Sequence, residues 1–206
     1  MKAITIDDNE AYLRQISVPV DINDSNLQND IKVLATFCEE NNILAMAAIQ
    51  LGIPKRMIYL KNTNLEIVKR MQTDDETTDD KNHNEAKILI NPVIIERKGL
   101  TEYWEACASC LDNMGLVKRP YKITLKYQDI NGNSYCDVFE GFESTVLSHE
   151  MDHLDGILHI DVAEKVLVMS LEERKKFRQT HDYKIFNKDE EYVRPVPKLR
   201  LIKQYN

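Results

Sequence analysis

The residues of this chain with the clearest chemical potential are His149, Glu150 and His153, in the segment His-Glu-Met-Asp-His. Residues four apart lie on the same face of a helix, so both imidazoles can bind one metal ion. Glu150 then stays near the ion without ligating it, where it can accept a proton from a water on the metal, as in hydrolytic zinc-type sites. The segment therefore indicates a catalytic metal site, and the alternative is a surface helix with two exposed histidines.

Two histidines do not complete such a site, and the sequence offers a third ligand on either side of them. Downstream, Gly156 and His159 extend the segment to His-Glu-x-x-His-x-x-Gly-x-x-His, the three-histidine pattern of the metzincin zinc endopeptidases. Upstream lie the thiols of Cys107 and Cys110. A Cys-x-x-Cys pair alone also fits a redox dithiol or a zinc ribbon, but a ribbon needs a second such pair, which the sequence lacks.

Hydrophobic periodicity indicates the elements that must position these residues. It predicts a helix over 142–154 that carries the histidines, with Leu147, Met151 and Leu154 on its apolar side. The fold class is therefore α+β, with antiparallel strands packed around a central metal-binding helix and a further helix near the C-terminus. The other expected elements are a helix from about 23–25 to 41–42, strands at 57–60, 88–90, 121–127 and 135–139, a solvated acidic loop at 73–82, a strand-like alternation at 157–161, and a charged surface helix at 171–180.

Length and composition restrict the classes of protein to which the chain can belong. Its 206 residues fit one domain with an appended tail. A net charge of -7 without a basic stripe argues against DNA binding. No apolar run approaches the roughly 20 residues of a membrane span, so we expect no membrane partner. Four cysteines in a chain of this length do not form a disulfide framework, which favours a reducing, cytoplasmic location.

Two further segments strengthen the hydrolase interpretation. Residues 43–50 read Ile-Leu-Ala-Met-Ala-Ala-Ile-Gln, and residues 105–109 read Glu-Ala-Cys-Ala-Ser. With 149–153 they resemble, in the same order, the three motifs of the peptide deformylases: Gly-x-Gly-x-Ala-Ala-x-Gln, Glu-Gly-Cys-Leu-Ser and His-Glu-x-x-His. That family removes the N-formyl group from new bacterial and organellar proteins. The resemblance implies a catalytic domain over 1–163, followed by a C-terminal helix and tail over 164–206.

The resemblance also implies roles for individual residues. It selects Cys107 over Cys110 and His159 as the third ligand, because Glu105 and Ser109 then fall on their motif positions. Cys107, His149 and His153 would hold one divalent ion, Fe2+ in the first place, with Zn2+, Ni2+ or Co2+ as alternatives. Glu150 would transfer protons, while the Gln50 side chain and the backbone N–H of Ala108 would stabilise negative charge on the formyl oxygen. The implied partners are formylated nascent peptides at the ribosome, and the implied substrate-binding residues are Leu44, Ala45, Glu105, Phe142 and Val146.

The chain departs from these motifs at four positions. Ile43 and Ala45 replace both glycines of the first motif, and Ala106 and Ala108 replace the glycine and leucine of the second. Glycine often marks a positive φ or the close approach of a ligand, and isoleucine tolerates positive φ poorly. Either the backbone at Ile43 is ordinary or the cleft is narrower than usual. We expect the hydrolytic chemistry to survive these changes. The alternative functions are a metzincin-like zinc endopeptidase and a non-catalytic protein that binds formylated N-termini.

Overall fold

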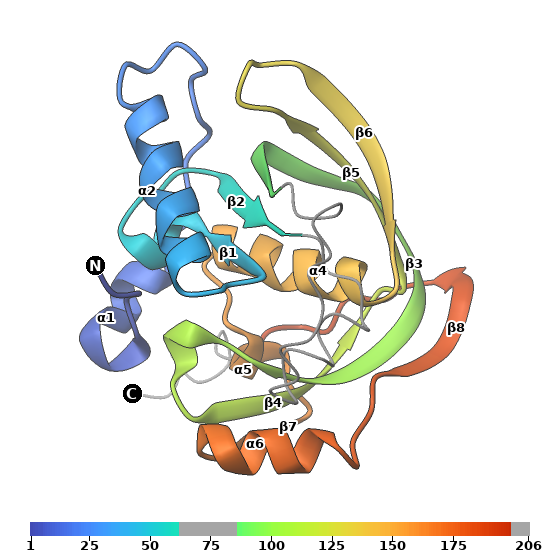
Figure 1. The fold of residues 1–206 in the computed structure, drawn as a ribbon. Coiled ribbons are helices and arrows are strands. Elements are labelled where there is room, and N and C mark those ends of the chain that lie inside the picture. Colours follow the sequence, from blue (N-terminus) through green and yellow to red (C-terminus); the bar gives the residue numbers. More distant parts are fainter. Residues whose placement is uncertain (62–85, 199–206) are drawn as a thin grey trace, which may run out of the picture.

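Helix α4 (Phe142–Leu154) lies at the centre of the molecule and carries the His-Glu-x-x-His segment. The computed structural model describes residues 1–61 and 86–198, and an eight-stranded antiparallel sheet curves around α4 (Figure 1). This arrangement confirms the predicted α+β class. The acidic segment 73–82, predicted to be a solvated loop, lies outside the described residues.

The described elements follow one another with short connections. In chain order they are α1 (Ile6–Leu13), α2 (Leu27–Glu40), β1 (Ala45–Ala47), the 3-10 turn η1 (Ala48–Leu51), β2 (Met57–Leu60), β3 (Lys87–Ala106), the 3-10 turn η2 (Ala108–Cys110), β4 (Asn113–Arg119), β5 (Lys122–Gln128), β6 (Ser134–Glu140), α4, α5 (His159–Val162), β7 (Lys165–Val168), α6 (Leu171–Arg178) and β8 (Lys184–Glu191).

Strand β3 pairs with four other strands of the sheet, and its C-terminal end carries part of the second motif to the site. Its first residues pair with β2 on one side and with β5 on the other, while its last residues pair with β4, from Thr101 opposite Arg119 to Ala106 opposite Met114. The sequence predicted only residues 88–90 as a strand. Beyond them, register shifts against β5 and the positive φ of Gly99 interrupt the regular alternation by which a strand is recognised.

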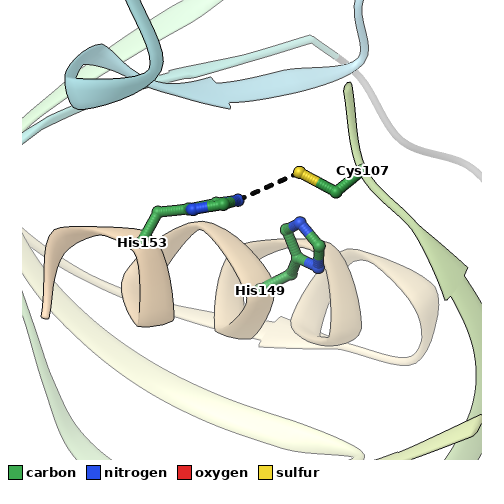
Figure 2. A group of neighbouring side chains, drawn as sticks. All are labelled: Cys107, His149 and His153. Atoms are coloured by element: carbon green, nitrogen blue, oxygen red, sulfur yellow. Dashed lines mark hydrogen bonds between the residues drawn. The ribbon is translucent and has the colours of Figure 1, made fainter. Parts of the chain in front are cut away.

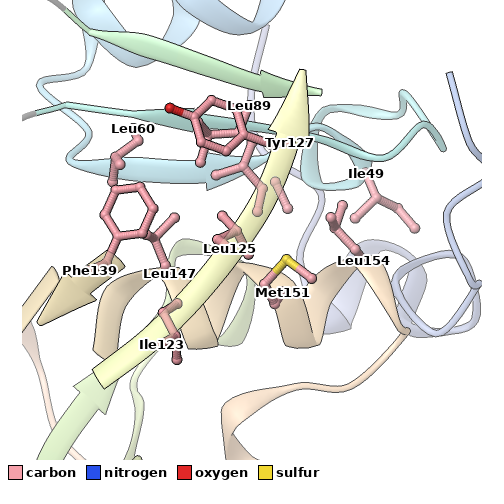
Figure 3. Close-up of a cluster of buried hydrophobic side chains, with 12 residues drawn as sticks. Ile49, Leu60, Leu89, Ile123, Leu125, Tyr127, Phe139, Leu147, Met151 and Leu154 are labelled. Carbon is pink, nitrogen blue, oxygen red and sulfur yellow. The ribbon is translucent and has the colours of Figure 1, made fainter. Parts of the chain in front are cut away.

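The apolar side of α4 is buried against this sheet. Leu147, Met151 and Leu154 were predicted on that side, and all three lie in one buried cluster with side chains from β2, β3, β5 and β6 (Figure 3). Full burial of each such side chain contributes about 1.5–3 kcal/mol. The cluster therefore fixes the helix rigidly enough for its opposite face to form a site. Its members are Ala47, Ile49, Ile58, Leu60, Leu89, Ile123, Leu125, Tyr127, Phe139, Leu147, Met151 and Leu154.

The chain reverses direction directly after α4. Gly156 has a φ of +71°, and a Cβ at this position would lie 2.3 Å from the backbone oxygen of Arg14, so no other residue fits. Helix α5 follows, and the predicted strand at 157–161 is wrong. The Asp161 carboxylate accepts a hydrogen bond of 2.8 Å from the N–H of Leu158, which caps this turn of helix in place of strand pairing.

Residues after 163 add more to the sheet than the sequence indicated. Helix α6 confirms the predicted charged helix, and no side chain in it is buried. Strands β7 and β8 were not predicted, and they pair with β4 and β3. Five of the eight residues of β8 are charged, so its sequence lacks the alternation of a half-buried strand. The domain boundary at 163 stays a prediction. In the described part of the chain, no helix is long and apolar enough to cross a membrane.

Candidate metal centre

Three side chains from two distant motifs meet beside α4. Cys107, His149 and His153 each offer one ligand atom, and these atoms lie within 4.8 Å of one another (Figure 2). Cys107 Sγ is 3.2 Å from His153 Nε2. One thiolate and two imidazoles form a donor set that suits a single zinc or iron ion and leaves a coordination position open for water. The residues therefore fit the metal site that the sequence predicted.

The end of β3 and the start of η2 place the thiol. Cys107 is the residue between them, and its backbone is extended while the next residues turn. Its sulfur accepts a hydrogen bond of 3.4 Å from the N–H of Ser109, so the turn that follows the strand also orients the side chain. The thiolate, rather than the thiol, is the form of cysteine that binds metals.

A buried ion-pair network fixes the first histidine. His149 Nδ1 donates to Glu105 at 2.9 Å, which leaves Nε2 as the ligand atom. Arg119 binds the same carboxylate through two hydrogen bonds of 2.7 and 2.9 Å and also pairs with Asp152. Burial raises the pKa of Glu105, but the Arg119 guanidinium more than offsets this effect and holds the pKa well below its usual value. Glu105 therefore stays charged and orients His149.

Sequence reasoning missed this network, although its members were visible. The sequence motifs gave Arg119 no role, and Asp152 appeared only as a residue inside the helical motif. The signal that could have revealed the network was the Asp152 carboxylate on a helix predicted to be buried, because a buried charge requires a partner. Arg194 from the C-terminal tail also pairs with Asp152.

Glu150 lies beside the three donor side chains and is buried. One of its oxygens accepts a hydrogen bond of 2.8 Å from the N–H of Ala47, the last residue of β1. Burial raises the pKa of Glu150 to about 7. A carboxyl group with a pKa near neutrality can both accept and release a proton under physiological conditions, as general acid–base catalysis requires.

Gln50 reaches the same point from η1. Its Oε1 accepts from the Ala47 N–H at 3.1 Å, and its Nε2 donates to Ser109 Oγ at 3.0 Å and to Cys107 Sγ at 3.4 Å. The first two motifs are thus in direct contact, and the amide group is held in one orientation next to the donor set.

A cavity of about 270 Å³ opens beside these residues. It is lined by every predicted site residue except His153, including Glu105, whose two oxygens are engaged by Arg119 and His149. This engagement favours a positioning role for Glu105 over the substrate contact implied by the motif. The lining residues that were not predicted include Tyr103 and Arg178, the latter from α6. The predicted residues along the wall are Leu44, Ala45, Gln50, Glu105, Cys107, Ala108, Phe142, Val146, His149 and Glu150.

The four departures from the motifs also line this cavity. None of Ile43, Ala45, Ala106 and Ala108 has a positive φ. Their backbone is therefore ordinary, and the glycines are not needed for chain conformation at these positions. What changes is space, because each added side chain occupies part of the cavity wall.

His159 comes close to the donor set but does not join it. Gly156 turns the chain so that the His159 ring stacks on the His149 ring, with 5.6 Å between centroids. Within the described residues, the metal-binding groups combine His159 with Cys107 and Cys110, and no group unites the three histidines. His159 is buried, and the three-histidine ligand set is not formed among the described residues.

Comparison with known proteins decides the family. The sequence model described as Polypeptide deformylase matches residues 1–168. This chain belongs to the peptide deformylase family. The peptide deformylase of Erythrobacter litoralis is 34% identical over 181 residues, which cover 81% of this chain and 92% of the relative. That of Pelagibacter ubique is 32% identical over 168 residues, or 81% of this chain and 88% of the relative.

Solved deformylase structures have the same fold. A probable peptide deformylase from Synechococcus phage S-SSM7 superposes with a TM-score of 0.65 at 28% identity, covering 79% of this chain and 99% of that one. A class I type b peptide deformylase from Acinetobacter baumannii, bound to Met-Ala-Ser, gives a TM-score of 0.64 at 27% identity, covering 79% and 97%. As a deformylase, the chain is a metal-dependent hydrolase that removes the N-formyl group from nascent proteins.

Proposed function

We propose that Cys107, His149 and His153 hold the single catalytic metal ion of this deformylase, at the inner end of the cavity. The observation that carries the proposal is the meeting of this donor set with Glu150 at one cavity. A bound ion supplies Lewis acidity, which polarises the formyl group and lowers the pKa of water. The remaining steps fall to side chains and backbone groups of the chain.

Glu150 moves the proton. It accepts a proton from the attacking water and delivers it to the methionine amine as the formyl C–N bond breaks. Its raised pKa of about 7 suits both halves of this task. The hydrogen bond from the Ala47 N–H holds one oxygen, so the carboxyl group is positioned through the whole cycle.

Gln50 and the backbone N–H of Ala108 stabilise the negative charge that develops on the formyl oxygen. One hydrogen of the Gln50 amide now points to Ser109 Oγ, and a small rotation redirects it to a bound formyl group. A donor of this kind contributes about 2.7–4 kcal/mol of transition-state stabilisation.

The outer part of the cavity receives the peptide. Phe142 and Val146 form an apolar wall for the methionine side chain. Strand β1 is the first strand of the sheet and pairs only with β2 among the described elements, so its other edge is open. Because Leu44 and Ala45 line the cavity, an extended substrate can pair with this edge as an added strand.

We further propose Fe2+ as the native ion and the cytoplasm, at the ribosome, as the place of action. A ferrous–thiolate site is sensitive to oxygen, so iron-loaded protein should lose activity in air and keep it under anaerobic handling. Equal activity of the iron form after long aeration would contradict the assignment of Fe2+.

The test of the mechanism is anaerobic release of formate from a formyl-methionyl tripeptide. Glu150→Ala should lower kcat by about 10²–10⁴-fold, the usual contribution of a general acid–base group, while metal content stays unchanged. Glu143→Ala is the matched control, because Glu143 lies on the same helix but does not line the cavity. Full turnover in Glu150→Ala, or no turnover in metal-loaded wild type, would refute the mechanism.

A further inference from the structure

We propose that Cys107, Cys110 and His159 form a second cation position that takes a thiophilic ion such as Zn2+ and shares the Cys107 sulfur with the catalytic site. The three side chains each offer one donor atom, and these atoms lie within 4.8 Å of one another. Their exposures are 8%, 0% and 1%. This position lies outside the proposed catalytic mechanism, which uses neither Cys110 nor His159.

The distances come close to those around one ion. Zinc binds cysteine sulfur at about 2.3 Å and histidine nitrogen at about 2.0–2.1 Å in a tetrahedral arrangement, so neighbouring donors lie roughly 3.6–3.8 Å apart. Side-chain rotation would therefore draw the three atoms, which lie within 4.8 Å of one another, closer together. Two thiolates and one imidazole are a known zinc ligand set with one further position open.

His159 supplies the independent observation that something binds here. Both of its ring nitrogens are buried, and neither has a hydrogen-bond partner among the described residues. A buried polar atom without a partner is destabilising, and a metal–nitrogen bond would remove this cost for one of the two nitrogens. The surroundings offer no substitute, because Cys107 and Cys110 lie in an apolar cluster with Leu13 and Leu158.

The fold makes room for the imidazole and directs both thiols toward it. A Cβ on Gly115 of β4 would lie 3.1 Å from His159 Cδ2 and 2.9 Å from the Ala163 Cβ, so the glycine keeps this space open. Cys110 donates its N–H to the Cys107 carbonyl at 3.1 Å, which closes the η2 turn. A Cys-x-x-Cys turn of this kind has the ligand spacing of zinc sites.

The two positions share one sulfur. Cys107 Sγ approaches His153 Nε2 at 3.2 Å in the catalytic set and belongs equally to the group with Cys110 and His159. A thiolate sulfur has several lone pairs and can contact two ions. The metzincin-like spacing of His159 therefore acquires a different meaning, as a ligand of the neighbouring position.

The experiment measures the number of zinc ions bound per chain. Metal-free protein is dialysed against Zn2+ under anaerobic, reducing conditions, and bound zinc is measured by elemental analysis. Wild type should bind two ions per chain, and both Cys110→Ala and His159→Phe should bind one. Cys38→Ala is the matched control, because Cys38 is fully buried in α2 outside the cluster, and it should bind two.

Further arms separate this proposal from the catalytic one. His149→Ala/His153→Ala should lose formate release and still bind one zinc, with Co2+ in its place giving the absorption band of cobalt–thiolate charge transfer. The circular dichroism of each variant checks folding, and His159→Phe, which keeps an aromatic ring in place of the imidazole, carries the test if Cys110→Ala is unstable. One zinc in wild type, or two in both cluster variants, overturns the second position, whereas absence of formate release in wild type bears only on the catalytic mechanism.

Discussion

Arg119 supports the proposed catalytic residues without lining the cavity. Its guanidinium neutralises Glu105, which orients His149, and Asp152, which lies on the same helix as both histidines. The pKa of Arg119 is raised well above its ordinary value, because the two carboxylates outweigh the effect of burial. Charges this deeply buried are tolerated only as a complete set.

Replacing Arg119 by methionine should therefore destabilise the protein by about 3–5 kcal/mol, because two carboxylates lose a buried partner. The free energy of unfolding in urea measures the loss. Lys118→Met is the control, since the pair between Lys118 and Glu164 is largely exposed, and it should cost less than about 1 kcal/mol. Equal losses in the two variants would show that the Arg119 network does not hold the site.

Gln50→Leu preserves the shape of the side chain and removes its amide. Removal of one donor to the developing oxyanion should lower kcat by about 10²–10³-fold with little change in KM. Steady-state formate release measures both constants. Ser109→Ala removes one of the two resting acceptors of the Gln50 amide, the other being Cys107 Sγ, and should leave kcat within a few-fold of wild type. A kcat unchanged in Gln50→Leu would assign the oxyanion to other donors.

For individual residues, the sequence predicts the candidate metal ligands better than the residues that position them. Cys107, His149, Glu150 and His153 were predicted because their spacing is short or their motifs are distinctive, and the structure brings them close together. The pairing of Arg119 with Asp152 joins residues 33 positions apart. A sequence displays both charges, but it does not show which buried carboxylate a given arginine neutralises.

Among the elements, α4 was predicted with its observed bounds, whereas α5 was predicted as a strand. Helix α4 combines an apolar side with a glycine at each end, Gly141 and Gly156. Five residues such as 157–161 are too few to separate a turn of helix from a strand, since buried positions can alternate in either. The bulges of β3 have the same effect on a larger scale, because each shifts the alternation by one residue.

The glycine after α4 gives a prediction at the element scale. Gly156→Ala forces a Cβ toward the Arg14 oxygen and into a positive φ, and we expect a loss of at least about 3 kcal/mol. Gly132→Ala in the β5–β6 turn is matched in φ, but its nearest neighbour is the Ile22 Cγ2 atom at 3.3 Å. It should cost only the conformational term of about 1–2 kcal/mol. Thermal unfolding of the two variants compares them, and equal losses would mean that the contact with Arg14 is unimportant.

For the molecule as a whole, residues beyond the deformylase match were the least predictable. The family model ends at residue 168, yet Arg178 lines the cavity and Arg194 pairs with Asp152. Helix α6 packs through an edge-to-face contact of Phe177 with Trp104, whose centroids are 5.1 Å apart. Charged, mostly exposed segments leave no periodicity, so the sequence did not show that this tail reaches the site.

Removal of the metal ion should lower the stability of the whole fold, because the donor set joins the end of β3 to α4. An ion that binds only the folded state stabilises it by about 2.7 kcal/mol at a free concentration 100 times its Kd. Chelation should therefore lower the Tm of wild type, and re-addition of metal should restore it. Cys107→Ala/His153→Ala should show no such shift. A Tm indifferent to chelation in wild type would mean that the ion contributes nothing to the stability of the fold.

Strand β3 has a kinetic consequence as well. It pairs with β2 from the N-terminal half of the chain, with β4 and β5 next to it, and with β8 near the other end. A contact between segments so far apart in sequence closes a large loop, and the entropy of that loop is lost before the contact contributes any stabilising free energy. Chains rich in such contacts fold in milliseconds to seconds rather than microseconds. During synthesis, β3 must therefore wait for its last partner until residue 191 has been made. The enzyme that processes nascent chains is itself a chain that completes its fold late.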